Sequence, residues 1–340
     1  MTPPVIQLEG LSKSFTPRSR LSFGRHSGEI RAVDDVSFAV SAGETLALVG
    51  ESGCGKSTTG RLILRLIEPS AGRILFEGRE IASERGREMR EVRRHLQIIF
   101  QDQFGSMSPR RTIAQIIAEP LDAQGLIRSA QHRRDTVAHL LERVGLSPEH
   151  MHRYPRQFSG GQRQRIGIAR AIGVNPRFIV ADEPVSALDV SVQAQIVNLL
   201  QDLQEEQRLS YLFISHDLAI VRHIADRVAV MYLGRIVEEG PKARIFAAPQ
   251  HPYTHALLSA APEANLAKRN RRIILQGDVP SPSAVPSGCS FRTRCPLAQE
   301  ICATERPPLR YVAPGQSAAC HFATPNPIAI PAAASEQLLA

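Results

Sequence analysis

The sequence of 340 residues contains no tryptophan, and only 5% of its residues are aromatic. It has no uninterrupted apolar run near the ~20 residues that a membrane-spanning helix needs, which excludes an integral membrane protein. Hydrophobic residues nevertheless make up 43% of the chain, enough to bury a core and to exclude disorder as its main state. The first ten residues lack the basic head and apolar stretch of a signal peptide, so we expect the chain to stay in the cytosol.

Charge of one sign is only moderately in excess. The chain has 41 lysines and arginines against 33 aspartates and glutamates, a net charge of +8. Such a balance suits nucleotides, anionic lipid surfaces or nucleic acid and does not choose among them. Five cysteines, an odd number, in a reducing compartment do not indicate a disulfide framework.

Short apolar runs alternate with segments of helical periodicity along most of the chain. The runs that predict strands are residues 45–49, 96–100, 178–181, 211–214 and 227–231. Helical periodicity follows in residues 56–67, and it marks one helix face at Ile196, Leu199, Leu200 and Leu203. This alternation predicts an α/β fold with a mostly parallel sheet covered on both faces. Residues from about 103 to 169 are mainly helical in pattern, and the chain beyond residue 249 is richer in Pro, Ser, Arg and Cys.

One segment fits the phosphate-loop pattern G-x4-G-K-[ST] without a mismatch: Gly50, Glu51, Ser52, Gly53, Cys54, Gly55, Lys56 and Ser57. Glycines let the backbone turn tightly and aim its N–H groups at phosphate oxygens, and the following helix adds the positive end of its dipole. Lys56 can reach the outer phosphates, and the Ser57 hydroxyl can join the shell of Mg²⁺. The segment lies between a predicted strand and a predicted helix, so we expect it to bind a nucleoside triphosphate rather than to be a simple glycine-rich turn.

Hydrolysis also needs a carboxylate for the metal and a group that orients water. The apolar run at 178–181 ends in Asp182 and Glu183, at the sheet edge where ligands of such folds bind. We expect Asp182 to hold Mg²⁺ and Glu183 to act as general base. His216 ends another predicted strand and could reach the γ-phosphate, although a lone histidine is more often structural.

These residues resemble the ATP-binding subunits of ABC transporters. Phe158 precedes a segment similar to the family signature, which usually begins with Leu instead: Ser159, Gly160, Gly161 and Gln162. The resemblance implies a RecA-like P-loop NTPase core with a helical signature subdomain at about residues 104–169. It also implies that this signature serves the ATP of a partner subunit, so that two chains sandwich two nucleotides head to tail.

The resemblance assigns further residues of the nucleotide site. Gln101 matches the glutamine that couples the metal and the γ-phosphate to the membrane subunits, and His216 matches the switch histidine. Asp189 ends the loop that crosses the dimer interface. Phe15 falls where an aromatic residue stacks on adenine, although an ordinary core phenylalanine fits equally well. Thr58 completes the predicted nucleotide-binding residues.

A narrower resemblance is to the oligopeptide/dipeptide importer branch, and within it to the F-type ATPase subunit. Residues 99–110 are similar to its glutamine-loop stretch, although Gln103 and Ser108 depart from the usual Pro and Asn. Residues 251–258 resemble its linker into a C-terminal extension. The expected division is a cassette at 1–250, an extension at 251–324 and a flexible tail at 325–340.

This likeness implies an ATPase that energises peptide uptake, peripheral to the cytoplasmic face of the cell (inner) membrane. The expected partners are a second, non-identical ABC ATPase, two membrane permeases and, indirectly, an extracytoplasmic substrate-binding protein, with no nucleic acid. A face within residues 119–153 would dock a permease. Nickel and glutathione importers share near relatives of the subunit, so they remain alternatives for the cargo. A soluble ABC-type ATPase of DNA repair or translation is the rival class, but its paired cassettes or long coiled coil are missing here.

Four cysteines gather late in the chain: Cys289, Cys295, Cys302 and Cys320. Four thiolates in so short a stretch could ligate an iron–sulfur cluster or Zn²⁺. The extension of peptide-importer ATPases resembles this stretch, and some members carry a [4Fe-4S] cluster there. The alternative is four reduced thiols packed in a small domain.

Cys54 is a separate case, because it lies beside Lys56 and a predicted helix N-terminus. Both features lower a thiol pKa, so we expect a reactive thiol whose alkylation blocks ATP binding. The alternative is that cysteine serves there only as a small residue.

Overall fold

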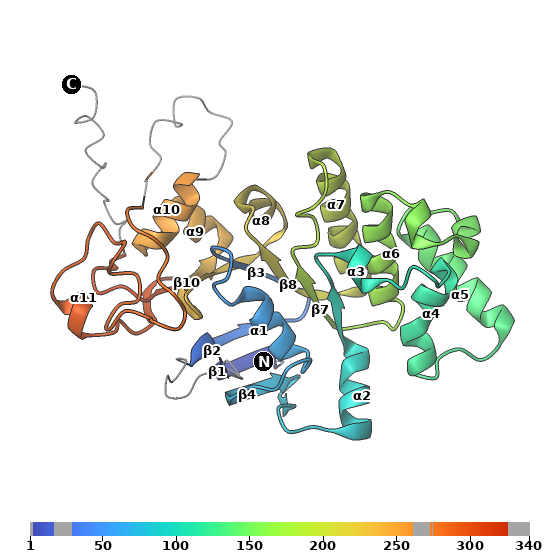
Figure 1. Cartoon of the computed structure of the whole chain (residues 1–340), viewed down its shortest axis with the longest axis horizontal. Coiled ribbons are helices and arrows are strands. Elements are labelled where there is room, and N and C mark those ends of the chain that lie inside the picture. The colour runs from blue at the N-terminus through green and yellow to red at the C-terminus, as the bar shows by residue number, and fades with distance from the viewer. Residues whose placement is uncertain (1–2, 17–28, 261–272, 274, 326–340) are drawn as a thin grey trace, which may run out of the picture.

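The computed structural model describes residues 3–16, 29–260, 273 and 275–325 (Figure 1). The expected tail at 325–340 therefore lies outside the described residues, apart from Pro325. Among the helices of the described residues, none is both long and apolar enough to span a membrane.

An eight-stranded sheet runs through the centre of the molecule in the order β11-β12-β10-β9-β3-β8-β7-β6. Neighbouring strands are parallel from β9 to β6, and these five are β9 (Arg227–Tyr232), β3 (Thr45–Val49), β8 (Ser210–Ser215), β7 (Phe178–Asp182) and β6 (Leu96–Ile99). They coincide with the five predicted apolar runs to within one residue at each end. The predicted α/β P-loop fold is confirmed in this part of the chain.

A second sheet is antiparallel and has the order β2-β1-β4-β5. Its strands are β1 (Ile6–Phe15), β2 (Ile30–Val40), β4 (Ala71–Phe76) and β5 (Arg79–Glu80). A mostly parallel sheet alone was therefore an incomplete prediction. The pairing of β1 with β2 shifts register three times, and Asp35 has a left-handed φ of 58°, so the alternation that marks a strand is interrupted.

Helices cover the main sheet on both faces. α1 (Lys56–Ile63) follows the phosphate loop, and it ends four residues earlier than predicted because Arg65 adopts a φ of 51°. α2 (Gly86–His95) leads into β6. The helical part of the chain comprises α3 (Gln103–Ser106), α4 (Ile113–Ala123), α5 (Ala130–Arg143), two short 3₁₀ turns (Pro148–His152 and Pro155–Gln157) and α6 (Gly160–Ile172), and it projects from one end of the molecule (Figure 1). The remaining helices are α7 (Val190–Gln207), α8 (Leu218–Ile224), α9 (Lys242–Ala247), α10 (Pro252–Ala260) and α11 (Ile301–Thr304).

The strand β7 shows how the main sheet separates two hydrophobic cores. All of its residues are buried. Phe178 and Val180 pack with the antiparallel sheet and α1, whereas Ile179 and Ala181 pack with the helical part and α7. Side chains alternate between the two faces of a strand, so a continuous apolar run is what a strand covered on both sides requires.

The C-terminal extension continues the main sheet. Its strands β12 (Gln316–Ala318) and β11 (Arg310–Ala313) add antiparallel to β10 (Arg235–Pro241). In the same hydrophobic core as Val237 of β10, the aromatic rings of Tyr232, Tyr253 and Phe291 lie with centroids 4.7 to 5.5 Å apart. The extension therefore packs on the cassette through both a sheet edge and a hydrophobic core.

Candidate nucleotide site

The phosphate loop joins β3 to α1 and can be built only with glycine at two positions. Gly50 has a φ of 153° and Gly55 one of 108°. A Cβ on Gly50 would lie 2.2 Å from the Met231 carbonyl oxygen, and one on Gly55 would lie 2.1 Å from that of Ala32. The motif's first and last glycines thus allow the loop to pass directly against neighbouring backbone.

Lys56 and Ser57 open α1 with their polar atoms aimed at the loop and at β7. The buried Lys56 ammonium donates to the carbonyl oxygens of Gly50 at 2.8 Å and Glu51 at 2.9 Å. Ser57 Oγ donates to Asp182 Oδ1 at 2.8 Å. Burial raises the pKa of the Asp182 carboxyl, and the bond from Ser57 offsets part of that rise.

Glu183 lies at the end of β7 in a left-handed conformation with a φ of 46°. Its Oε2 accepts a hydrogen bond from Gln101 Nε2 at 2.9 Å, and His216 Nδ1 lies 3.4 Å from the same oxygen. The Glu183 side chain is only 16% exposed, whereas that of His216 is 59% exposed. Two side chains that follow the ends of two other strands therefore converge on the Glu183 carboxylate.

A cavity of about 520 Å³ unites most of the predicted site. Its lining consists of Ala32, Ser52, Gly53, Gly55, Lys56, Ser57, Thr58, Gln101, Glu183 and His216. Asp182 is buried behind Ser57, and Gly50, Glu51 and Cys54 do not line the cavity. An anionic ligand in this space would meet the loop, the first turn of α1 and the Glu183 carboxylate together.

Other predicted residues lie outside this cavity. Phe15 ends β1 with 42% of its surface exposed, so it is not an ordinary core residue. Ser159 caps α6 by accepting from the Gln162 N–H at 3.3 Å, and it is exposed together with Gly160. Asp189 is exposed at the start of α7, next to Val190, which is 82% exposed. The signature and Asp189 thus lie outside the cavity at the chain's own phosphate loop.

Cys54 does not have the environment expected for a reactive thiol. It is buried, with Lys56 Nζ 3.8 Å from its sulfur. Burial raises the pKa of the thiol, and this effect outweighs the nearby ammonium. The prediction of a lowered pKa was wrong, and the structure fits the alternative of a small residue packed within the loop.

Of the four late cysteines, Cys302 and Cys320 are buried, and Cys289 and Cys295 are partly buried. Among the described residues, no three His, Cys, Asp or Glu side chains are arranged so that they could hold a metal ion. Cys289 and Cys295 pack beside the core that contains Phe291, and Cys320 belongs to a neighbouring small cluster, yet Cys289, Cys302 and Cys320 all lie near enough to act on the Cys295 thiol. Burial raises the pKa of the Cys295 thiol to about 12. The described residues therefore give no support for a [4Fe-4S] cluster or zinc at these thiols, and the cluster stays a prediction.

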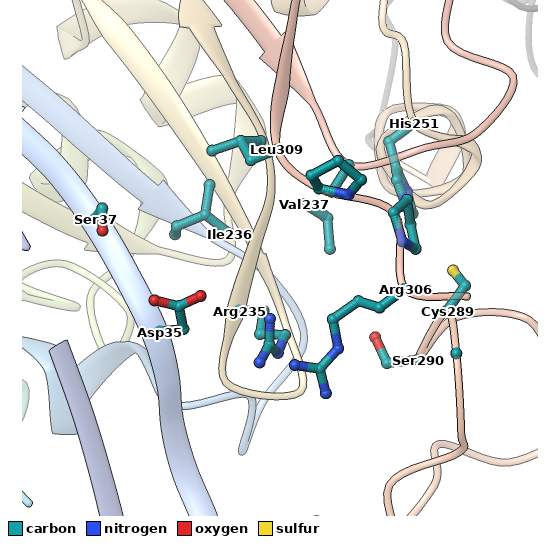
Figure 2. A pocket seen from close by; sticks show the side chains of 14 residues that line it. Asp35, Ser37, Arg235, Ile236, Val237, His251, Cys289, Ser290, Arg306 and Leu309 are labelled. Atoms are coloured by element: carbon teal, nitrogen blue, oxygen red, sulfur yellow. The ribbon is translucent and has the colours of Figure 1, made fainter. Parts of the chain in front are cut away.

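A second cavity, about 500 Å³, lies where the extension meets β2 and β10 (Figure 2). Arg235 and Arg306 project into it, and Cys289 lies at its far wall. Both guanidinium groups approach Asp34, at 2.7 and 3.9 Å, so their charge is already partly balanced. Apart from Cys289, this cavity includes no predicted site residue.

Sequence reasoning missed residues that touch the phosphate loop from elsewhere in the chain. Ala32 lines the cavity from β2, and no pattern marks it. Tyr253 and Arg294 contact Glu51, although both fall in stretches that had suggested only the importer branch. No local pattern in the sequence marks these contacts, which join residues more than 200 positions apart.

Known proteins resemble this chain over nearly its whole length. Residues 33–186 match the ABC transporter family, and residues 237–302 match the family described as "Oligopeptide/dipeptide transporter, C-terminal region". A probable peptide ABC transporter ATP-binding protein, y4tS of Sinorhizobium fredii, is 52% identical over 96% of this chain and 92% of its own length. The oligopeptide transport ATP-binding protein AppF of Bacillus subtilis is 51% identical over 94% and 97%.

The chain belongs to the ABC transporter ATP-binding proteins of the oligopeptide/dipeptide import family. Among solved structures, the ATP-binding cassette MJ0796, a dimer bound to ADP and Pi, aligns with a TM-score of 0.61 and 27% identity over 70% of this chain and 98% of its own. These relatives favour the importer family over a soluble ATPase of DNA repair or translation. In this ABC ATPase, the phosphate loop, Gln101, Glu183 and His216 line one cavity.

Proposed function

We propose that this ABC ATPase hydrolyses ATP to drive import of di- or oligopeptides through membrane permeases. The observation that carries the proposal is the single cavity in which the phosphate loop, Ser57 and the Glu183 carboxylate meet. The peptide cargo is supported by the names of the relatives y4tS, a probable peptide transporter subunit, and AppF, an oligopeptide transport protein.

Triphosphate binding follows from the loop. Its N–H groups and the start of α1 present partial positive charge to phosphate oxygens. Lys56 Nζ, now bonded to the carbonyls of Gly50 and Glu51, can exchange these neutral acceptors for charged phosphate oxygens, which accept stronger hydrogen bonds. Phe15, exposed at the end of β1, offers a ring for the base.

Ser57 and Asp182 are the residues that would hold Mg²⁺. Their oxygens are 2.8 Å apart, and a hydroxyl with a carboxylate is a donor set that suits this hard cation. Mg²⁺ bound there would neutralise charge that develops on the phosphate oxygens. Gln101, at the edge of the same cavity, would extend this shell.

Glu183 is the proposed general base. Its sheltered carboxylate can accept a proton from an attacking water, and Gln101 orients it through the 2.9 Å bond to Oε2. His216 Nδ1 lies 3.4 Å from the same carboxylate oxygen, and the exposed ring can contact the γ-phosphate as the water attacks. Each group has a defined position before the nucleotide binds.

A second, non-identical cassette would complete the site. The exposed signature, Ser159 to Gln162, presents the N-terminus of α6 outward, where it can bind the phosphates of a partner's ATP. Asp189 and Val190 offer an exposed surface beside it. The solved MJ0796 cassette, also described as dimeric, supports this arrangement.

In this proposal the ATPase is peripheral to the cytoplasmic face of the membrane, where it docks two permeases through the helical part within residues 119–153. The binding protein delivers peptide from the other side. The division into a cassette at 1–250 and an extension at 251–324 belongs to the same proposal.

The test is uptake of a radiolabelled tripeptide by cells that lack the gene and carry a wild-type or variant copy. We expect Lys56→Ala to abolish uptake because ATP no longer binds. Glu183→Gln should also abolish it and lower ATP hydrolysis about 10²- to 10⁴-fold while ATP stays bound. The matched control Glu205→Gln, an exposed acid on α7, should transport normally.

Peptide uptake that survives Glu183→Gln would contradict the role of this carboxylate. Uptake of Ni²⁺ or glutathione, measured in the same strains, separates the cargo from the chemistry. If the variants lose uptake of Ni²⁺ or of glutathione but keep uptake of peptide, the role as a transport ATPase stands and the peptide cargo is contradicted.

A further inference from the structure

The phosphate loop is held from outside by the C-terminal extension. Glu51, the second residue of the loop, donates its backbone N–H to Tyr253 Oη at 2.8 Å. Its carboxylate accepts two hydrogen bonds from the guanidinium of Arg294, at 2.8 and 3.0 Å. Tyr253 and Arg294 lie 202 and 243 positions away in the sequence. Two residues from beyond the cassette thus contact one residue of the loop.

The contacting groups are themselves fixed. The Arg294 side chain is only 8% exposed, and its guanidinium lies 6.0 Å from the centre of the Tyr232 ring. Tyr253 is fully buried against the rings of Tyr232 and Phe291. A bidentate ion pair sheltered in this way has a defined geometry, unlike an exposed pair between flexible side chains.

Glu51 is thereby held on three sides. Tyr253 accepts from its N–H, Arg294 binds its carboxylate, and Lys56 Nζ donates to its carbonyl oxygen at 2.9 Å. Lys56 is the residue expected to reach the outer phosphates. The extension therefore fixes the peptide group on which that lysine rests before a nucleotide arrives.

We propose that Arg294 and Tyr253 are positioning residues of the nucleotide site, which hold the phosphate loop in its binding conformation through Glu51. The inference rests on the proposed binding of ATP by this loop. A loop fixed in advance loses less conformational entropy when it binds, so the clamp should act on ATP affinity. Neither residue lines the nucleotide cavity, so neither should act on the chemical step.

The experiment measures the Kd of MgATP and the KM and kcat of ATP hydrolysis for the full-length protein with its companion subunits. We expect Arg294→Gln to raise Kd and KM about tenfold, because it removes two hydrogen bonds to a charged group. Tyr253→Phe, which removes one hydroxyl, should raise them about threefold. In both variants kcat at saturating ATP should stay within about twofold of wild type.

A double-mutant cycle isolates the contact. Glu51→Gln combined with Arg294→Gln should bind ATP no more weakly than Arg294→Gln alone, because both changes remove the same ion pair. Arg294→Lys should recover part of the affinity. The matched control is Arg292→Gln, since this partly buried arginine donates to the Ser287 carbonyl oxygen within the extension and should leave Kd unchanged.

If Arg294 favours ATP binding, bound ATP must in turn stabilise the contacts of Arg294, and this gives a measurement that does not depend on activity. MgATP should slow hydrogen exchange at residues 289–295 in the wild type and do so less in Arg294→Gln.

The inference would be overturned if both Arg294→Gln and Tyr253→Phe kept the wild-type Kd for MgATP and the wild-type hydrogen exchange. A fall in kcat with KM unchanged would also overturn it. Wild-type protein without ATP affinity would overturn the proposed function itself. If Arg294→Gln fails to fold, Tyr253→Phe decides, because it keeps the ring in the aromatic core.

Discussion

Single residues in the phosphate loop show which positions are fixed by chemistry and which by packing. Gly50 and Gly55 are required because neighbouring carbonyl oxygens leave no room for a Cβ. Lys56 and Ser57 follow from the motif, and their placement was predictable from the sequence. Cys54 was not, because its pKa depends on burial by residues distant in the chain. The roles assigned to Lys56, Asp182 and Glu183 remain predictions that the variants above test.

His251, just before α10, should make stability depend on pH. It is buried, and burial together with the charge of His255 lowers its pKa to about 3. The folded protein therefore keeps the ring neutral, while the unfolded chain binds a proton below its ordinary pKa of about 6.5. The stability contributed by His251 is complete above pH 6.5 and is lost as the pH falls toward 3, by up to about 1.4 kcal/mol per unit.

Thermal unfolding from pH 7 to pH 4 checks this dependence. The melting temperature of the wild type should fall more steeply than that of His251→Gln, which has no titrating ring at this position. His223→Gln, a change at an exposed histidine on α8, should follow the wild-type curve. Parallel curves for wild type and His251→Gln would contradict the assignment.

At the scale of elements, the parallel strands were predictable and the antiparallel sheet was not. Strands such as β7 are continuous apolar runs because both of their faces are buried. The antiparallel strand β2 alternates instead, and Asp34 and Asp35 interrupt its pattern at a bulge. A local sequence pattern shows clearly that both faces of a strand are buried. It does not show which distant strand a segment pairs with.

The helix α7 offers a direct comparison of two leucines predicted to share one face. Leu200 is fully buried, whereas Leu199 is only partly buried and packs at the rim of the same core. We expect Leu200→Ala to lower the free energy of unfolding by about 2–5 kcal/mol, and Leu199→Ala to cost clearly less, since it leaves a smaller cavity. Chemical denaturation of both variants measures the difference. Equal losses would show that the two side chains are equally buried.

At the scale of the whole molecule, the extension was predictable as a segment but its attachment was not. Composition and family resemblance marked a change near residue 250, yet no local pattern shows that β12 pairs with β10 or that Arg294 reaches Glu51. The late cysteines are a related case. Their spacing allows a cluster, and the fold brings all four thiols near enough to influence one another, but no described group of side chains is arranged to hold a metal.

The central claim is that a triphosphate binds in the loop between Gly50 and Ser57 and brings a second cassette onto it. Light scattering of Glu183→Gln protein, alone and mixed with its companion ATPase, tests this claim most directly. The account predicts that MgATP raises the molar mass from that of one chain to that of two. A second substitution in the same chain, Lys56→Ala, should abolish this rise. A mass that MgATP leaves unaltered in every mixture would contradict it.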